Sequence, residues 1–155
     1  MPSFHASKLL PPELVADEAA SDDDCTVFAI HATGASSACP SCGAISNRVH
    51  NRYHRRLADL PMAGRRVVLM LQARRFRCDA VRCARRIFTE RFDENIFKPW
   101  ARRTARLDQI VQRPALALGG RPAASFVRRL SLPISNDTLL RAVRRRGSPS
   151  FPPRR

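Results

Sequence analysis

The sequence predicts an α+β fold, in which a small antiparallel β domain is followed by a domain of three short helices. Three observations lead to this prediction. Apolar residues alternate with a period of two in the first part of the chain, which is typical of strands, and after residue 100 they recur at helical spacing. Two close pairs of cysteines flank the clearest strand pair, so a metal could hold the β domain together.

The first 24 residues form an acidic leader that we expect to be mostly irregular. It contains six acidic residues against one lysine, and "LLPPELVADEAASDDD" mixes prolines, small residues and acids without a sustained period. We therefore place the β domain over 25–95 and the helical domain over 100–146. The tail over 147–155 has no periodicity and is predicted to be disordered.

Four segments of the β domain have the composition of strands. "CTVFAIHAT" (25–33) is a short run of β-branched and aromatic residues. In "RRVVLMLQARRFRC" (65–78) alternate residues are apolar. A proline and a glycine precede this segment, so 49–57 and 65–78 should form an antiparallel hairpin. We expect a further strand in "RIFTERF" (86–92).

Four of the five cysteines form two close pairs around this hairpin. Two residues separate Cys39 from Cys42, and four separate Cys78 from Cys83, which are spacings typical of zinc ligands. In a reducing cytosol such pairs indicate a metal rather than disulfides. Four thiolates would fill the tetrahedral shell of Zn²⁺ and leave no position for water or substrate. The sequence therefore predicts a zinc ribbon with a structural metal.

Two other interpretations of these residues stay open. His50 or His54 could replace one cysteine as a ligand, although the spacer after Cys42 is shorter than the ~12 residues of a compact zinc finger. Alternatively, the four paired cysteines are metal-free core residues. Cys25 stands apart from both pairs, and we expect it to be a buried thiol of a strand.

Three short helices are predicted after residue 100. Pro114 should kink or split the first helix, because proline lacks the N–H group and its ring clashes with the preceding turn. The glycine pair at 119–120 ends this helix, and "SLP" ends the second. Ser135 is a good N-cap for the third, from Asn136 to about Arg145. Short helices joined by tight turns are typical of a helix-turn-helix unit.

The net charge of +15 is carried almost entirely by arginine and lies after the acidic leader. Arginine suits bidentate contacts with phosphates and bases, so nucleic acid is the first partner to consider, and a solvated basic face is the alternative. No apolar run approaches the ~20 residues that span a bilayer, and no signal peptide is recognisable. We therefore expect a soluble, cytoplasmic protein.

These features resemble, in their order, a known protein family. "CPSCGAISNRVHNRYHRRLADLP", "RRFRC" and "RIFTERF" resemble the zinc-binding N-terminal region of the ISL-three family of bacterial insertion-sequence transposases. "RRTARL" and "LALGGRPAASFVRRLSLPISNDTLLRAVRR" resemble its helix-turn-helix segment. The likeness covers about residues 25–147. It implies that both parts bind double-stranded DNA at the terminal inverted repeats of a mobile element.

Candidate DNA contacts lie on and near the third helix. Asn136, Asp137 and Thr138 are at its start, where a recognition helix presents side chains to base edges. Phosphate contacts are expected from five arginines, namely Arg128, Arg129, Arg141, Arg144 and Arg145. We expect Ser135 only to cap the helix. A solvated surface position is the alternative for each arginine, so only their clustering is informative.

Members of the resembled family continue into a catalytic domain in which separated acidic residues hold two metal ions. After residue 95 this chain contains only Asp108 and Asp137 as acids, whereas two-metal chemistry needs several carboxylates. We therefore expect no catalytic residues and a truncated or frameshifted transposase, associated with the nucleoid and able to associate with full-length transposase. The alternatives are a zinc-ribbon module for protein interaction or regulation, and a non-functional remnant.

Overall fold

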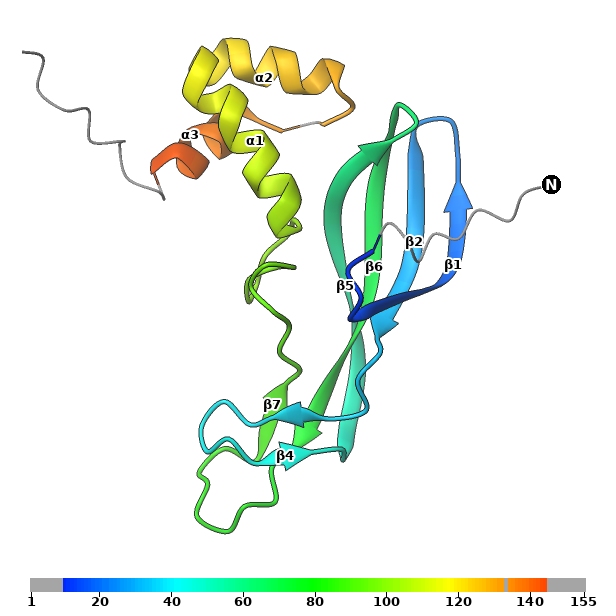
Figure 1. Ribbon diagram of the computed structural model, residues 1–155, viewed down its shortest axis with the longest axis vertical. Helices are drawn as coiled ribbons and strands as arrows, with labels where there is room; N and C mark the ends of the chain where they lie inside the picture. The colour runs from blue at the N-terminus through cyan, green and yellow to red at the C-terminus, as the bar shows by residue number, and fades with distance from the viewer. Residues whose placement is uncertain (1–9, 133, 145–155) are drawn as a thin grey trace, which may run out of the picture.

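The computed structural model describes residues 10–132 and 134–144. A long sheet occupies the right of the view, the short strands lie at its lower end, and the helices lie to the left of its upper end (Figure 1). The α+β class is confirmed. In chain order the described elements are β1 (Leu14–Ser21), β2 (Cys25–Ala32), β3 (Ser37–Ala38), β4 (Ile45–Ser46), β5 (Val49–Met62), β6 (Arg65–Arg77), β7 (Ile87–Thr89), α1 (Ala105–Leu118), α2 (Gly120–Arg129) and α3 (Asn136–Arg144).

The main sheet is mixed, and the prediction of a wholly antiparallel domain was wrong. Its order is β1-β2-β6-β5, with β7 pairing with the last residues of β6. The predicted hairpin is confirmed, since β5 and β6 pair antiparallel. However, β2 runs parallel to β6, with Phe28 opposite Leu69 and Ile30 opposite Leu71. Packing of distant apolar residues decides which strand β2 joins, and local alternation does not reveal it.

The acidic leader is also not irregular throughout, because Leu14–Ser21 form β1 at the edge of the sheet. This strand pairs antiparallel with β2. Asp22 makes the turn between them, since its Oδ1 accepts hydrogen bonds from the N–H groups of Asp24 and Cys25 at 2.9 and 2.6 Å. Most β1 side chains are exposed. Backbone pairing rather than an apolar face holds the strand, which is why its sequence pattern is weak. The first nine residues lie outside the described part.

One face of the sheet carries an apolar core that β2, β5 and β6 share. Ile30, Leu57, Leu69 and Leu71 are each no more than 1% exposed, and each such side chain contributes about 1.5–3 kcal/mol on full burial. The connection from β7 to α1 covers this face with the buried Ile96 and Phe97. The connection therefore holds the helices close to the sheet.

The three helices pack around a second core, which includes Leu107, Val111, Val127 and Leu139. Three helices were predicted and three are described, but Pro114 does not split α1, which runs from Ala105–Leu118. Burial of the neighbouring turns in this core offsets the hydrogen bond that the proline cannot make. No described helix has the length and apolarity needed to cross a lipid bilayer. The predicted disordered tail lies outside the described residues.

A buried carboxylate joins the helices to the sheet. Asp59 of β5 is 2% exposed. Its Oδ1 accepts hydrogen bonds from Oγ1 of Thr104 at 2.6 Å and from Nε of Arg106 at 2.8 Å, and its Oδ2 pairs with Nη2 of Arg106. The hydrogen bond with Asp59 holds the pKa of Arg106 above its usual range. Thr104 also caps α1 through the N–H of Leu107, so the first turn of α1 is fixed to β5.

Candidate metal centre and nucleic-acid interface

The first cysteine pair lies on the turn between β3 and β4. The N–H of Cys39 donates to the carbonyl of Ala44 at 2.9 Å, and the N–H of Gly43 donates to the carbonyl of Cys39 at 2.8 Å. Gly43 has a φ of 75°, a conformation that glycine adopts without strain. The "CPSCG" sequence thus makes a tight turn that brings the thiols of Cys39 and Cys42 together.

The second cysteine pair follows the end of β6. Cys78 comes directly after the strand, and Cys83 lies in the loop that leads to β7. The two cysteine turns also contact each other, because Nε of Arg85 donates to Oγ of Ser41 at 2.9 Å. The long β5–β6 hairpin begins beside the first turn and ends at the second, so it brings together pairs that are far apart in the sequence (Figure 1).

The four sulfur atoms form a compact group that matches a tetrahedral metal site. All four lie within 4.8 Å of one another. The Sγ atoms of Cys39 and Cys83 are 3.9 Å apart, and those of Cys42 and Cys78 are 3.6 Å apart. A tetrahedron of Zn–S bonds of ~2.3 Å has edges of about 3.8 Å. The thiol positions therefore fit Zn²⁺ bound by four cysteines.

The other candidate ligands lie apart from this group. Within the described residues it is the one cluster of three or more His, Cys, Asp or Glu side chains that could hold a metal, and it contains no histidine. His50 and His54 are exposed on β5. Cys25 begins β2 and is partly exposed, so the expectation of a buried thiol there was wrong.

The thiols of Cys39 and Cys78 differ in how readily they ionise. Burial opposes ionisation of Cys39, but hydrogen bonds from the N–H groups of Ser41 and Cys42 and from neighbouring thiols lower its pKa to about 7. The N–H of Ala80 favours the thiolate of Cys78, but burial and the surrounding thiols outweigh it and raise the pKa to about 12. The positive charge of a bound metal would stabilise several adjacent thiolates at once, so burial and the neighbouring thiols would no longer keep Cys78 protonated.

A small aromatic core supports the cysteines. Phe76 of β6 and Phe88 of β7 are buried and stacked, with ring centroids 5.9 Å apart, and they contact Cys39, Cys78 and Cys83. Few other apolar side chains reach this end of the molecule. A core of this size is too small to be stable alone, so we expect the metal to contribute much of the stability there.

The predicted DNA-contact residues lie mostly on exposed surface of the helices. Asp137, Arg141 and Arg144 are exposed on α3, at positions that share one helix face. Arg128 and Arg129 are exposed in the last turn of α2. The cap is confirmed, since Oγ of Ser135 accepts from the N–H of Thr138 at 3.4 Å and lies 3.0 Å from its Oγ1. Arg145 lies outside the described residues.

Asn136 is directed toward the neighbouring helix. Its Oδ1 is buried and has no hydrogen-bond partner. A Cβ atom on Gly120, at the start of α2, would lie 2.0 Å from this oxygen. The close approach of α3 to α2 therefore depends on a glycine, and Asn136 would have to turn away from α2 to reach a base.

Most arginines of the helical unit formed by α1–α3 have no acidic partner among the residues that the structure describes. Residues 105–144 contain seven arginines and two aspartates, a net charge of +5. Within the described residues, the ion pairs involving these groups are Arg106 with Asp59 and Arg103 with Asp108. Six exposed arginines of the unit lack an acidic partner there, namely Arg113, Arg121, Arg128, Arg129, Arg141 and Arg144.

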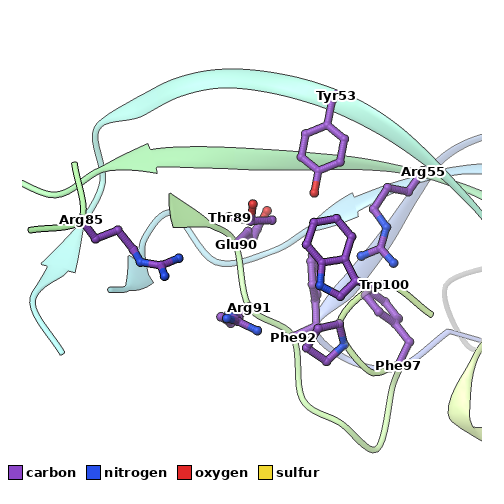
Figure 2. Close-up of a pocket in the computed structure, with 10 residues that line it drawn as sticks. Tyr53, Arg55, Arg85, Thr89, Glu90, Arg91, Phe92, Phe97 and Trp100 are labelled. Carbon is purple, nitrogen blue, oxygen red and sulfur yellow. The ribbon is translucent and has the colours of Figure 1, made fainter. Parts of the chain in front are cut away.

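Sequence reasoning missed a pocket between β5 and the connection to α1. Figure 2 shows Trp100 in this pocket, below Tyr53, with Arg85 and Arg91 on the opposite side. The one signal in the sequence was a single tryptophan, preceded by a proline, in a strongly basic chain.

A known protein-family model matches part of the chain. Residues 35–83 match the model described as the zinc-finger of transposase IS204/IS1001/IS1096/IS1165, an ISL3-type zinc ribbon. The match covers about a third of the chain and includes all four cysteines of the group. No curated protein and no solved structure matches the chain significantly. Residues 35–83 are therefore a transposase-associated zinc ribbon whose clustered cysteines fit a structural Zn²⁺.

Proposed function

We propose that this chain is a transposase-type DNA-binding protein, which a structural zinc stabilises and whose helical unit contacts double-stranded DNA. The target would be the terminal inverted repeats of a mobile element, as the family of the matching zinc ribbon suggests. Cys39, Cys42, Cys78 and Cys83 would hold the zinc. Because four thiolates fill its coordination shell, the metal would have no open position for chemistry.

The observation that carries this proposal is the set of exposed arginines on the helical unit that have no acidic partner among the described residues, including Arg128, Arg129, Arg141 and Arg144. Arg141 and Arg144 share the exposed face of α3 with Asp137. Leu139, which is fully buried, lies on the opposite face of the helix and fixes its orientation. A helix held in this way can enter a groove of DNA, and arginines at its end can reach phosphates. Arg128 and Arg129 extend the basic surface onto α2.

The charge of this surface favours DNA over a neutral partner. Guanidinium groups without acidic partners form bidentate contacts with phosphate, and binding releases the counterions that surround the duplex. The arginines make the proposal testable residue by residue, whereas Asn136 contributes less to it because its amide oxygen is buried against α2. Contacts of Asp137 and Thr138 with bases remain part of the proposal.

Fluorescence anisotropy with a labelled duplex that carries the element's end repeat tests the proposal. We expect Arg141→Ala/Arg144→Ala to weaken binding by roughly 10-fold or more, because two charge-assisted contacts are lost. The matched control is Arg48→Ala, since this exposed arginine pairs with Asp79 at the zinc end, and it should bind nearly as the natural protein does.

Two results would contradict the proposal. The first is equal affinity of the double variant and the control. The second is the absence of any duplex binding at low salt by zinc-loaded protein, which would instead favour a protein-interaction module. Comparison with a scrambled duplex shows whether the end repeat is preferred.

A further inference from the structure

The pocket beside Trp100 combines aromatic rings with positive charge. It has a volume of about 110 Å³ and lies between β5, the segment after β7 and the connection that leads to α1. The aromatic side chains come from Tyr53, Phe92, Phe97 and Trp100. Figure 2 shows the hydroxyl of Tyr53 pointing toward the indole of Trp100. A single water molecule needs a cavity of only about 10–15 Å³, so this pocket can hold a larger group.

The exposure of Trp100 is not explained by packing, whereas its backbone conformation follows from a turn. The N–H of Ala101 donates to the carbonyl of Lys98 at 3.0 Å, and Trp100 is the third residue of this turn, after Pro99. Its side chain is 90% exposed, although a tryptophan buries more apolar surface than any other residue when it packs inside a protein. Its φ is 63°, in the left-handed region that bulky side chains rarely adopt. The third position of such a turn needs a positive φ and is usually taken by glycine, so this turn places an exposed tryptophan where glycine would be less strained.

Three arginines line the same pocket. Arg85 and Arg91 are exposed, and within the described residues neither pairs with an acid. Arg55 is held in place, because its Nη2 donates to the carbonyl of Ala101 at 2.8 Å and its guanidinium lies 5.5 Å from the centre of the Phe97 ring. The pocket therefore offers aromatic rings to a flat apolar group and guanidinium groups to an anion, so it suits a ligand that has both.

The acid that lines the pocket does not cancel this charge. Glu90 is buried and forms an ion pair and hydrogen bonds with Arg74. Since Arg74 neutralises this carboxylate, the charge that a ligand meets comes from the arginines.

We propose that this pocket binds an unstacked nucleotide of single-stranded or locally opened DNA. The base stacks on Trp100 next to Tyr53, and the flanking phosphates contact Arg85 and Arg91. Stacking on an aromatic ring accepts any base, and arginines that follow the backbone add affinity without sequence preference. The residues that line the pocket extend from Arg85, close in sequence to Cys83, to Trp100, close to the start of α1. A strand that leaves the helices toward the cysteines therefore passes the pocket. This inference rests on the proposed function for its partner, DNA, but it uses a different surface.

The fluorescence of Trp100 tests the inference directly, because it is the only tryptophan of the chain. Titration of zinc-loaded protein with single-stranded oligo(dT) should quench the indole emission as a base stacks on the ring. Trp100→Ala should weaken binding of labelled oligo(dT) by roughly 5- to 150-fold, the range for loss of one stacked base. Phe126→Ala is the matched control, since it removes a 46% exposed aromatic ring outside the pocket, and it should leave this affinity unchanged.

A glycine variant separates binding from folding. Trp100→Gly removes the ring but relieves the positive φ, so it should bind oligo(dT) as weakly as the alanine variant without a lower Tm or zinc content. Arg85→Ala and Arg91→Ala should each make the affinity less salt-dependent.

Three outcomes would overturn the inference. They are unquenched Trp100 emission at saturating oligo(dT), equal affinity of the natural protein and Trp100→Ala, and equally strong quenching by polyglutamate, which would indicate an acidic protein partner. The duplex experiment with Arg141→Ala/Arg144→Ala is independent of this pocket. If those arginines matter while oligo(dT) fails to quench, only the pocket inference fails. If oligo(dT) quenches while the helical arginines have no effect, the proposed function of the helical unit fails instead.

Discussion

Replacement of Asp59 should destabilise the connection between sheet and helices more than its single ion pair suggests. Asp59→Ala leaves the hydroxyl of Thr104, a 4% exposed residue, without its acceptor. An unsatisfied buried donor costs about 1–3 kcal/mol. Arg106 can turn toward solvent because its side chain is 39% exposed, so loss of its ion pair adds only about 0–1 kcal/mol.

The expected loss for Asp59→Ala is therefore about 1–4 kcal/mol in the free energy of unfolding. This corresponds to a fall in Tm of roughly 2–16 °C for a chain of this length. Denaturant unfolding of zinc-loaded protein measures it.

A double-mutant cycle separates the hydroxyl from the ion pair. Thr104→Val keeps the shape of the side chain but removes the hydroxyl, so Asp59→Ala should cost less in that background, by about 0.5 kcal/mol or more. Two results would refute this account of how Asp59 contacts Thr104 and Arg106. One is an unfolding free energy of Asp59→Ala within about 0.5 kcal/mol of that of the natural protein, and the other is purely additive effects in the cycle.

Three further predictions concern the zinc site and the helix packing. Cys39→Ser should lose bound zinc, measured by elemental analysis, together with the β-strand signal of the cysteine end, and retention of one zinc per chain would contradict the four-cysteine site. Zinc binding at pH 7 should release two or more protons, because without metal the pKa of Cys78 is about 12 and that of Cys83 is raised. The zinc affinity should therefore rise with pH. A pH-indicator dye measures the proton release, and no release on zinc binding would contradict this prediction. Gly120→Ala should cost about 1–3 kcal/mol in unfolding free energy and be rescued by Asn136→Ala, whereas an equal loss in both backgrounds would exclude the contact.

Local patterns in the sequence were enough to predict much of this molecule. Alternation identified β2 and the β5–β6 hairpin, and helical spacing identified α1–α3 with the cap at Ser135. The cysteine spacing also predicted which four thiols lie together. In each case the signal comes from residues close in sequence, or from a residue type whose chemistry is restrictive.

Features that depend on distant partners could not be predicted in this way. The parallel pairing of β2 with β6 and the edge strand β1 depend on long-range contacts. Asp59 lies in "RRLADLP" and has the pattern of a surface acid, because its partners on α1 are more than 40 residues away. Likewise, only the folded chain places Trp100 beside three arginines from other segments.

The salt dependence of duplex binding tests the central claim most directly. A labelled duplex is titrated with zinc-loaded protein at salt concentrations between about 50 and 200 mM, and the logarithm of the binding constant is plotted against that of the salt concentration. If the unpaired arginines of the helical unit contact phosphates, the slope should be about −3 or steeper, since each neutralised phosphate contributes about −0.9. A slope near zero, or one that Arg141→Ala/Arg144→Ala leaves unchanged, would contradict DNA binding by this surface.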